Sequence, residues 1–145
     1  MTSTTFCLAS AGGFFLVGLV TGTWKYACIA TSAEARAPFY VDTAHRASLL
    51  YAFACALLAQ LTARNAWPDG ATLAAAILLV GFFAVSVFGY IVHGALRDTD
   101  NQLARPHRLG RRTVAPAAML TFMVSLAVVE IAGFAVIFSG YLMAS

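Results

Sequence analysis

The chain has 145 residues, of which 61% are hydrophobic and only 10% are charged, and its mean hydropathy is +0.81. Soluble domains usually contain about 45–50% apolar residues, so this composition excludes an ordinary water-soluble protein and indicates a membrane protein. The net charge of +3 comes from nine basic and six acidic residues. Nearly all of them lie in two short segments, which indicates loops beside lipid headgroups and argues against a nucleic-acid partner.

Four apolar segments are each long enough to cross a bilayer, which takes about 20 helical residues. They run from about Thr5 to Trp24, Thr43 to Ala63, Ala71 to Leu96 and Thr113 to Met143. No internal repeat or low-complexity tract interrupts them. The sequence therefore predicts an all-α fold, a four-transmembrane-helix bundle of an integral membrane protein, with residues 1–145 forming one domain.

The first segment is rich in glycine, and Gly18 and Gly22 form a GxxxG pair, which indicates close packing against another helix. Trp24, Lys25 and Tyr26 follow as an interfacial group that we expect to close this helix at headgroup level. No basic residue precedes the apolar run, so we interpret it as a retained helix and not as a cleavable signal peptide.

The basic residues are distributed very unevenly among the connections. Eight of the nine fall after the first or the third segment; only Arg64 lies in the second connection, and the termini have none. The positive-inside rule then places the two basic connections in the cytoplasm and both termini outside. A binding pocket is expected in the cytoplasmic half, where several polar residues share one depth.

The cysteines support neither a disulfide framework nor a zinc site. There are three, Cys7, Cys28 and Cys55, an odd number without CxxC spacing. CxxCH is absent as well, which excludes covalent attachment of a c-type haem by the usual motif. The sequence also lacks a Walker loop, GxGxxG, GxSxG, HExxH and any basic-aromatic array suited to nucleic acid.

The stretch from Phe39 to Ala56 begins as a polar turn with Asp42, His45 and Arg46 and continues as an apolar helix. Two interpretations of His45 are open. It could cap the helix and hydrogen-bond Asp42 or a headgroup. It could also be an axial ligand of haem iron, because imidazole suits iron and the adjoining helix supplies an apolar wall for a porphyrin.

The third segment offers Ser86, Tyr90 and His93 on one stripe by i, i+4, i+7 spacing. His93 is expected at the same depth as His45, so the two could form a bis-histidine haem site, although a plain helix end explains His93 equally well. Tyr90 is a candidate proton donor or anchor for a substrate oxygen, or an ordinary buried tyrosine.

Glu130 is the one acidic residue inside the fourth segment. Such residues usually have a function and a partner in the bundle interior; Lys25, His45, His93 or a tyrosine hydroxyl are the candidates. A neutral glutamic acid hydrogen-bonded between helices is the competing interpretation. The connection from Arg97 to Arg112 is either a solvated loop or a lid over the mouth of the pocket.

These residues resemble a family of small four-helix membrane proteins that includes styrene oxide isomerase and hydroxylaminobenzene mutase. The resemblance depends on Ala44-His45 at the start of the second helix and on Tyr90, 45 residues further on. The Asn101-Gln102 pair in the third connection and the glycine-rich first helix that ends near Trp24 add to it. Helices two and three, about a third of the chain, carry most of it.

The resemblance implies a homotrimer in a bacterial cytoplasmic (inner) membrane that binds haem b between subunits. His45 would be the axial iron ligand, and Tyr90 would steer a small, apolar, oxygen-containing substrate. Ferric iron would act as a Lewis acid on an epoxide, and a 1,2-shift would give the aldehyde. The chain departs from the family at two positions: it has Tyr51 where the family has asparagine, and Phe82 where the family has an acidic residue.

Tyr51 and Tyr90 are therefore the candidate catalytic residues, and His45 is the candidate haem and metal ligand. His93, Glu130 and Asn101 are candidates for supporting positions around them. Two other functions remain open: an electron carrier with haem held by both His45 and His93, and a haem-free structural subunit in which His45 and Glu130 only fix helix packing.

Overall fold

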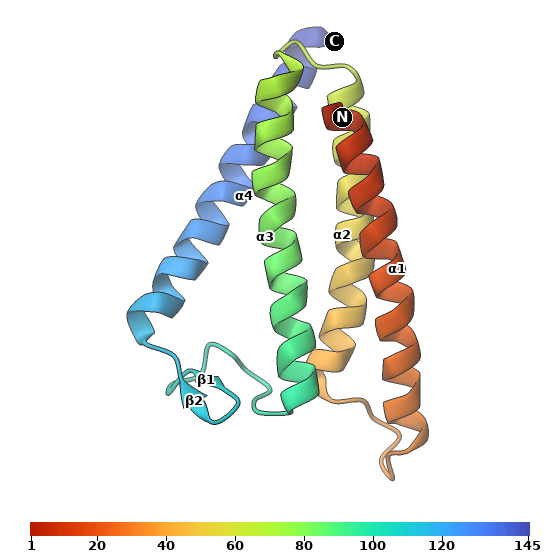
Figure 1. Ribbon diagram of the computed structural model, residues 1–145, viewed down its shortest axis with the longest axis vertical. Coiled ribbons are helices and arrows are strands. Elements are labelled where there is room, and N and C mark those ends of the chain that lie inside the picture. The colour runs from red at the N-terminus through yellow and green to blue at the C-terminus, as the bar shows by residue number, and fades with distance from the viewer.

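The computed structural model describes all residues, 1–145, and consists of four long helices with a small hairpin between the last two (Figure 1). The helices are α1 (Ser3–Ala30), α2 (Phe39–Ala63), α3 (Asp69–Leu96) and α4 (Pro116–Ala144). Two short antiparallel strands, β1 (Arg108–Leu109) and β2 (Arg112–Thr113), pair in the connection before α4. Each helix is long and apolar enough to cross a membrane, as the sequence predicts.

Three helix ends have residues that favour a helix terminus: the starts of α1 and α4 and the end of α3. The side chain of Thr2 accepts a hydrogen bond from the Thr5 backbone N–H at the start of α1. Helix α3 ends at Leu96, and its C-cap residue Arg97 has a left-handed φ of 49°. Pro116 occupies the first turn of α4, where its missing N–H leaves no helical hydrogen bond unmade.

Two predicted helix boundaries are wrong. Helix α1 does not end at Trp24 but continues through Lys25 and Tyr26 to Ala30, and α2 begins at Phe39, so the expected polar turn is helical. Interfacial and charged residues do not stop a helix by themselves, and Asp42 is favourable in a first helical turn. The hairpin of β1 and β2 was also not predicted, because strands of two residues leave no alternating pattern.

Helices α1, α2 and α3 pack together, whereas α4 contacts them mainly near its C-terminal end (Figure 1). The core contains buried residues from all four helices, among them Cys7, Leu58, Leu79 and Ile137. The three cysteines are free. Toward its N-terminal end α4 diverges from α3, and the hairpin connection lies below the resulting wedge (Figure 1).

The junction that holds α4 to the other helices is polar. The Asn65 side-chain amide donates to the Ile137 carbonyl oxygen at 2.8 Å, and the Ala66 N–H donates to the Gly140 carbonyl at 3.0 Å. Trp67 Nε1–H adds a hydrogen bond to the Ser139 hydroxyl. Both termini and this junction lie at one end of the molecule, and the two basic connections lie at the other (Figure 1).

Candidate functional site

His45 lies between α1 and α2, in the second turn of α2. Its Nδ1 is 2.8 Å from the carbonyl oxygen of Gly18 on α1. A backbone carbonyl can only accept a hydrogen bond, so Nδ1 must carry the proton and donate it. In the neutral ring the lone pair is then on Nε2, which makes no hydrogen bond within the chain. The imidazole is half-buried and fixed in orientation by the backbone of the neighbouring helix.

Two glycines of α1 make room for this packing. A Cβ on Gly22 would lie 2.8 Å from His45 Cε1, and a Cβ on Gly18 would meet the side chain of Leu49 at 2.5 Å. Neither distance is compatible with a side chain, so the close approach predicted from the GxxxG spacing is confirmed.

The interpretation of His45 as a helix cap bonded to Asp42 is wrong. Asp42 pairs instead with Lys25 on α1, at 2.5 Å, and with Arg46 one turn later, at 3.5 Å. Because α2 begins at Phe39 and not at Thr43, His45 lies beyond the first turn and has no capping role. The ion pair ties the same two helices that hold the imidazole.

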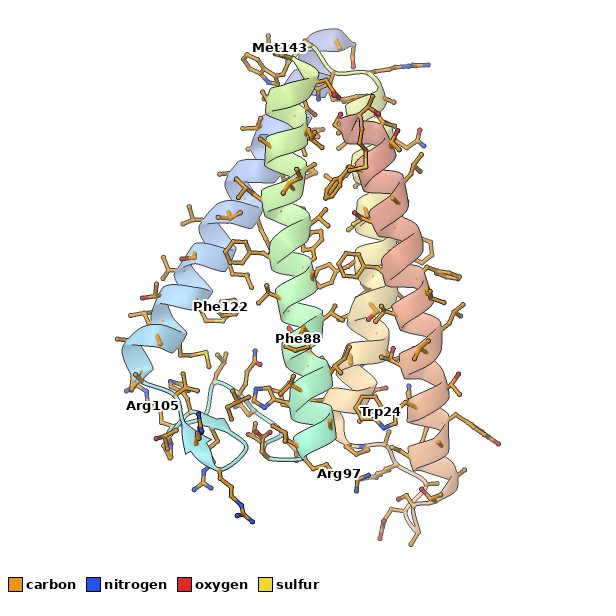
Figure 2. All side chains as sticks on the ribbon, viewed as in Figure 1. Trp24, Phe88, Arg97, Arg105, Phe122 and Met143 are labelled. Carbon is orange, nitrogen blue, oxygen red and sulfur yellow. The ribbon has the colours of Figure 1, made fainter.

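A cavity of about 380 Å³ lies in the wedge between α3 and α4, in the half of the molecule near the basic connections, where the sequence predicts a pocket. Its walls are mostly apolar, with phenyl rings from both helices; Figure 2 labels Phe88 on α3 and Phe122 on α4. The lining residues are Tyr51, Val85, Ser86, Phe88, Gly89, Tyr90, Val92, Gln102, Leu109, Phe122, Met123 and Leu126.

Tyr51 and Tyr90 both line this cavity, and stacked aromatic rings hold each of them. Tyr51 stacks on Phe83 with ring centroids 4.1 Å apart, and Tyr90 stacks on Tyr40 at 5.8 Å. Such pairs stabilise a fixed ring position, so the two tyrosines take defined places in a mostly apolar cavity whose other polar lining residues are Ser86 and Gln102. The structure thus places the two candidate catalytic tyrosines at the same cavity.

His93 is buried at the end of α3 and is bonded to the following loop. Its Nδ1 donates to Asp98 Oδ1 at 2.8 Å, and Asp98 Oδ2 accepts the backbone N–H of Gly110. Burial alone would raise the pKa of Asp98, but the hydrogen bonds from Gly110 and His93 outweigh it and lower that pKa below its ordinary value. His93 therefore anchors the connection between α3 and α4.

The connection between α3 and α4 closes one side of the cavity, which supports the lid interpretation over a merely solvated loop. Gln102 and Leu109 line the cavity, and the Gln102 N–H donates to the Tyr40 hydroxyl at 2.7 Å. Asn101 is exposed and accepts the Leu103 N–H, so it shapes the loop without reaching the cavity. Sequence reasoning missed Tyr40, which orders both the loop and Tyr90.

The structure does not place His45 and Tyr51 in one cavity. They are six residues apart on α2, which puts them about 120° apart around the helix axis. His45 bonds the backbone of α1. Tyr51 instead stacks on Phe83 of α3, lies beside the ring of Phe14 on α1 and lines the cavity. His45 and His93 likewise have separate partners, and no three His, Cys, Asp or Glu residues are grouped closely enough to hold a metal ion by themselves.

Glu130 has none of the partners considered for it. Its Oε1 is buried and makes no hydrogen bond. The side chain instead lines a second, smaller cavity of about 150 Å³ between α2, α3 and α4. Within this chain, no interhelical hydrogen bond to Glu130 supports the alternative of a neutral glutamic acid bonded between helices.

Comparison with protein-family models, with curated proteins and with solved structures finds no match for this chain.

Proposed function

We propose that this protein is a multi-pass isomerase of a bacterial cytoplasmic membrane that uses haem b and acts on small, apolar, epoxide-like molecules. Membrane insertion is supported by four helices with mean hydropathies between 1.4 and 2.5 over their most apolar windows. Most of their surface is not covered by the chain, and large apolar side chains point outward from all four. The basic connections at one end support an orientation with both termini outside.

The hydrogen bond from His45 Nδ1 to the Gly18 carbonyl carries the proposal. Metal-binding histidines almost always donate the ring N–H that does not face the metal to a carboxylate, a carbonyl or water. That bond fixes the tautomer and makes the other nitrogen a better ligand. Gly22 leaves the space that the ring occupies, because a Cβ there would lie 2.8 Å from His45 Cε1.

An exposed apolar surface beside His45 supports the haem proposal. Phe15 and Leu19 are exposed on the stripe of α1 next to Gly18 and Gly22, and Phe53 is exposed one turn beyond Leu49 on α2. Exposed Arg46, at the charged end of the same helix, offers a cation for the carboxylates of haem. His45 would hold the iron, and these apolar residues would cover the ring.

When bound, ferric haem supplies a Lewis acid for the epoxide oxygen. The hydroxyl groups of Tyr90 and Tyr51 orient the substrate oxygen inside the cavity. The apolar walls hold the hydrocarbon part and keep out water, which would otherwise open the epoxide to a diol. The reaction has no net transfer of electrons, so the chain needs no redox partner.

A homotrimer would bring the separated parts together. His45 and the tyrosine cavity face directions about 120° apart around α2. In a closed ring of copies, the His45 side of one chain meets a different side of the next, as head-to-tail interfaces do. The tyrosine cavity of one copy would then adjoin the haem held by its neighbour.

The test is turnover of an aryl epoxide by the purified protein in its ferric and its dithionite-reduced forms. We expect the aldehyde as product from the ferric form and strongly reduced turnover after reduction, because reduction lowers the positive charge on the metal. Equal activity in both forms would contradict the Lewis-acid mechanism. A diol product would contradict the exclusion of water by the cavity.

A further inference from the structure

Glu130 lies midway between Pro116 and Ala144, in the middle of α4, and has no part in the proposed isomerisation. A carboxyl group at that depth is costly for a membrane helix, so it needs a proton or a partner of opposite charge. Oε1 is buried without any hydrogen bond. The basic residues lie near the helix ends and in the loops, so the chain does not supply a cation to Glu130.

The cavity beside Glu130 is lined otherwise by carbon. Phe83 from α3 and Phe134 from α4 contribute phenyl rings, and the remaining lining residues are aliphatic: Ala54, Leu57, Leu58 and Leu79. Aromatic faces attract organic cations through the ring quadrupole, most strongly where water is excluded. A carboxylate together with two phenyl rings is therefore a set of groups that suits an ammonium ion.

The same lining argues against an inorganic cation. Calcium takes six to eight oxygen ligands and magnesium demands an octahedral set, whereas this cavity offers one carboxyl group. An organic ammonium ion needs no such shell, because its alkyl groups pack on apolar walls. A cavity of about 150 Å³ is the size that accepts a benzene ring in a protein interior, so it takes the phenyl substituent of such an ion.

We propose that Glu130, Phe83 and Phe134 form an intramembrane binding site for a lipophilic organic ammonium ion. The ammonium group pairs with the Glu130 carboxylate between the two rings, and its apolar substituent fills the space lined by α2 and α3. The site shares no lining residue with the tyrosine cavity, although Phe83 also stacks on Tyr51. It depends neither on haem nor on the proposed isomerase activity.

The test uses benzyltrimethylammonium and its uncharged isostere neopentylbenzene, with binding to the purified full chain in detergent followed by calorimetry. We expect saturable binding of the cation only. Glu130→Gln keeps the shape of the side chain and should weaken binding about a hundredfold, because the counter-charge is lost. Phe134→Leu should weaken it about tenfold. Glu34→Gln, an exposed acid in the α1–α2 connection, should leave it unchanged.

A second measurement does not depend on calorimetry. The hydrophobic reagent dicyclohexylcarbodiimide should modify Glu130, as located by mass spectrometry of the digested chain, and benzyltrimethylammonium should protect it whereas neopentylbenzene should not. Circular dichroism shows whether each variant keeps its helices. Equal binding of the two probes, unchanged affinity in a folded Glu130→Gln variant, or modification that the cation does not slow would each overturn the site.

Discussion

The α1–α2 contact and the wedge between α3 and α4 are built in opposite ways. In the first, two glycines let the helices approach so closely that the ring of His45 fills the space and bonds the backbone of the partner helix. In the second, α4 is held at one end through Asn65 and diverges at the other, where a cavity of about 380 Å³ opens.

This difference separates a tightly packed contact from an open one. The tight packing against a carbonyl suits the role we propose for His45, because a metal ligand must be held in one tautomer and one direction. The open wedge suits the role we propose for the cavity, because a small apolar substrate needs volume and a few polar groups. Four changes test this contrast. One alters the packing of the α1–α2 contact, one alters the junction that holds α4, and two alter groups of the cavity and of the loop that closes it.

The largest effect is expected from Gly22→Ala. The added Cβ would lie 2.8 Å from His45 Cε1, so the ring must move and lose its hydrogen bond to Gly18. We expect the free energy of unfolding in detergent to fall by about 1–3 kcal/mol, as for other overpacked sites. Haem retention should fall with it, measured as Soret absorbance per protein after purification.

Gly12→Ala is the matched control on the same helix, because nothing lies within 4 Å of a Cβ at Gly12. It should be neutral or slightly stabilising, since alanine is the better helix former. Equal effects of the two substitutions would show that the α1–α2 contact is not close at Gly22.

The next effect is expected at the junction that holds α4. Asn65→Ala removes the hydrogen bonds that Asn65 makes to the Ile137 carbonyl and the Trp67 N–H. We expect a loss of about 1–2 kcal/mol in the free energy of unfolding. Gln60→Ala, at an exposed amide in the last turn of α2, is the control. Faster hydrogen exchange in α4 alone would show that the wedge depends on this junction, and unchanged exchange would contradict it.

The sequence was sufficient for the four helices, because their apolar runs far exceed those of soluble proteins. It also predicted the close approach at Gly18 and Gly22 and the half of the molecule that holds the cavity. It could not show that α4 diverges from α3, because α4 is apolar all round and no stripe indicates its packing. Nor could it show that His45 and Tyr51 point apart, since that depends on where α1 and α3 pack around α2.

The sequence also did not predict which residues Tyr40 and Asp98 contact, because these contacts too depend on tertiary packing. Tyr40 meets Gln102 across 62 residues, and Asp98 meets Gly110 through a loop with no regular pattern. Glu130 was identified as exceptional by its position in an apolar segment. Its lack of any partner became evident only from the packing around it.

A smaller effect is expected from Tyr90→Phe, which removes one hydroxyl group from the cavity and leaves the ring stacked on Tyr40. We expect kcat/KM for an aryl epoxide to fall about tenfold, which corresponds to roughly 1.4 kcal/mol of transition-state stabilisation. Haem content should not change. A loss of haem would instead place Tyr90 in the packing of the haem site.

The smallest effect concerns the loop that closes the cavity. The lowered pKa of Asp98 means that its hydrogen bonds stabilise the fold fully above the ordinary value of 3.8, and that this contribution is lost as the pH falls through the lower, folded-state pKa. Hydrogen exchange of the Gly110 amide, corrected for the intrinsic rate, should accelerate in that acid range. In Asp98→Asn, the exchange rate of the Gly110 amide should show no such acceleration at acid pH. An acceleration of the same size in this variant would exclude Asp98 as its origin.

The measurement that tests the role of His45 most directly is the absorption spectrum of purified His45→Ala beside that of the unchanged protein. We expect the unchanged protein to show the Soret band of high-spin ferric haem, and the variant to lack it while circular dichroism shows intact helices. His93→Ala should leave the spectrum as it is, because His93 is bonded to Asp98. Haem retained by a folded His45→Ala protein, or a low-spin bis-imidazole spectrum lost in His93→Ala, would contradict His45 as the single protein ligand.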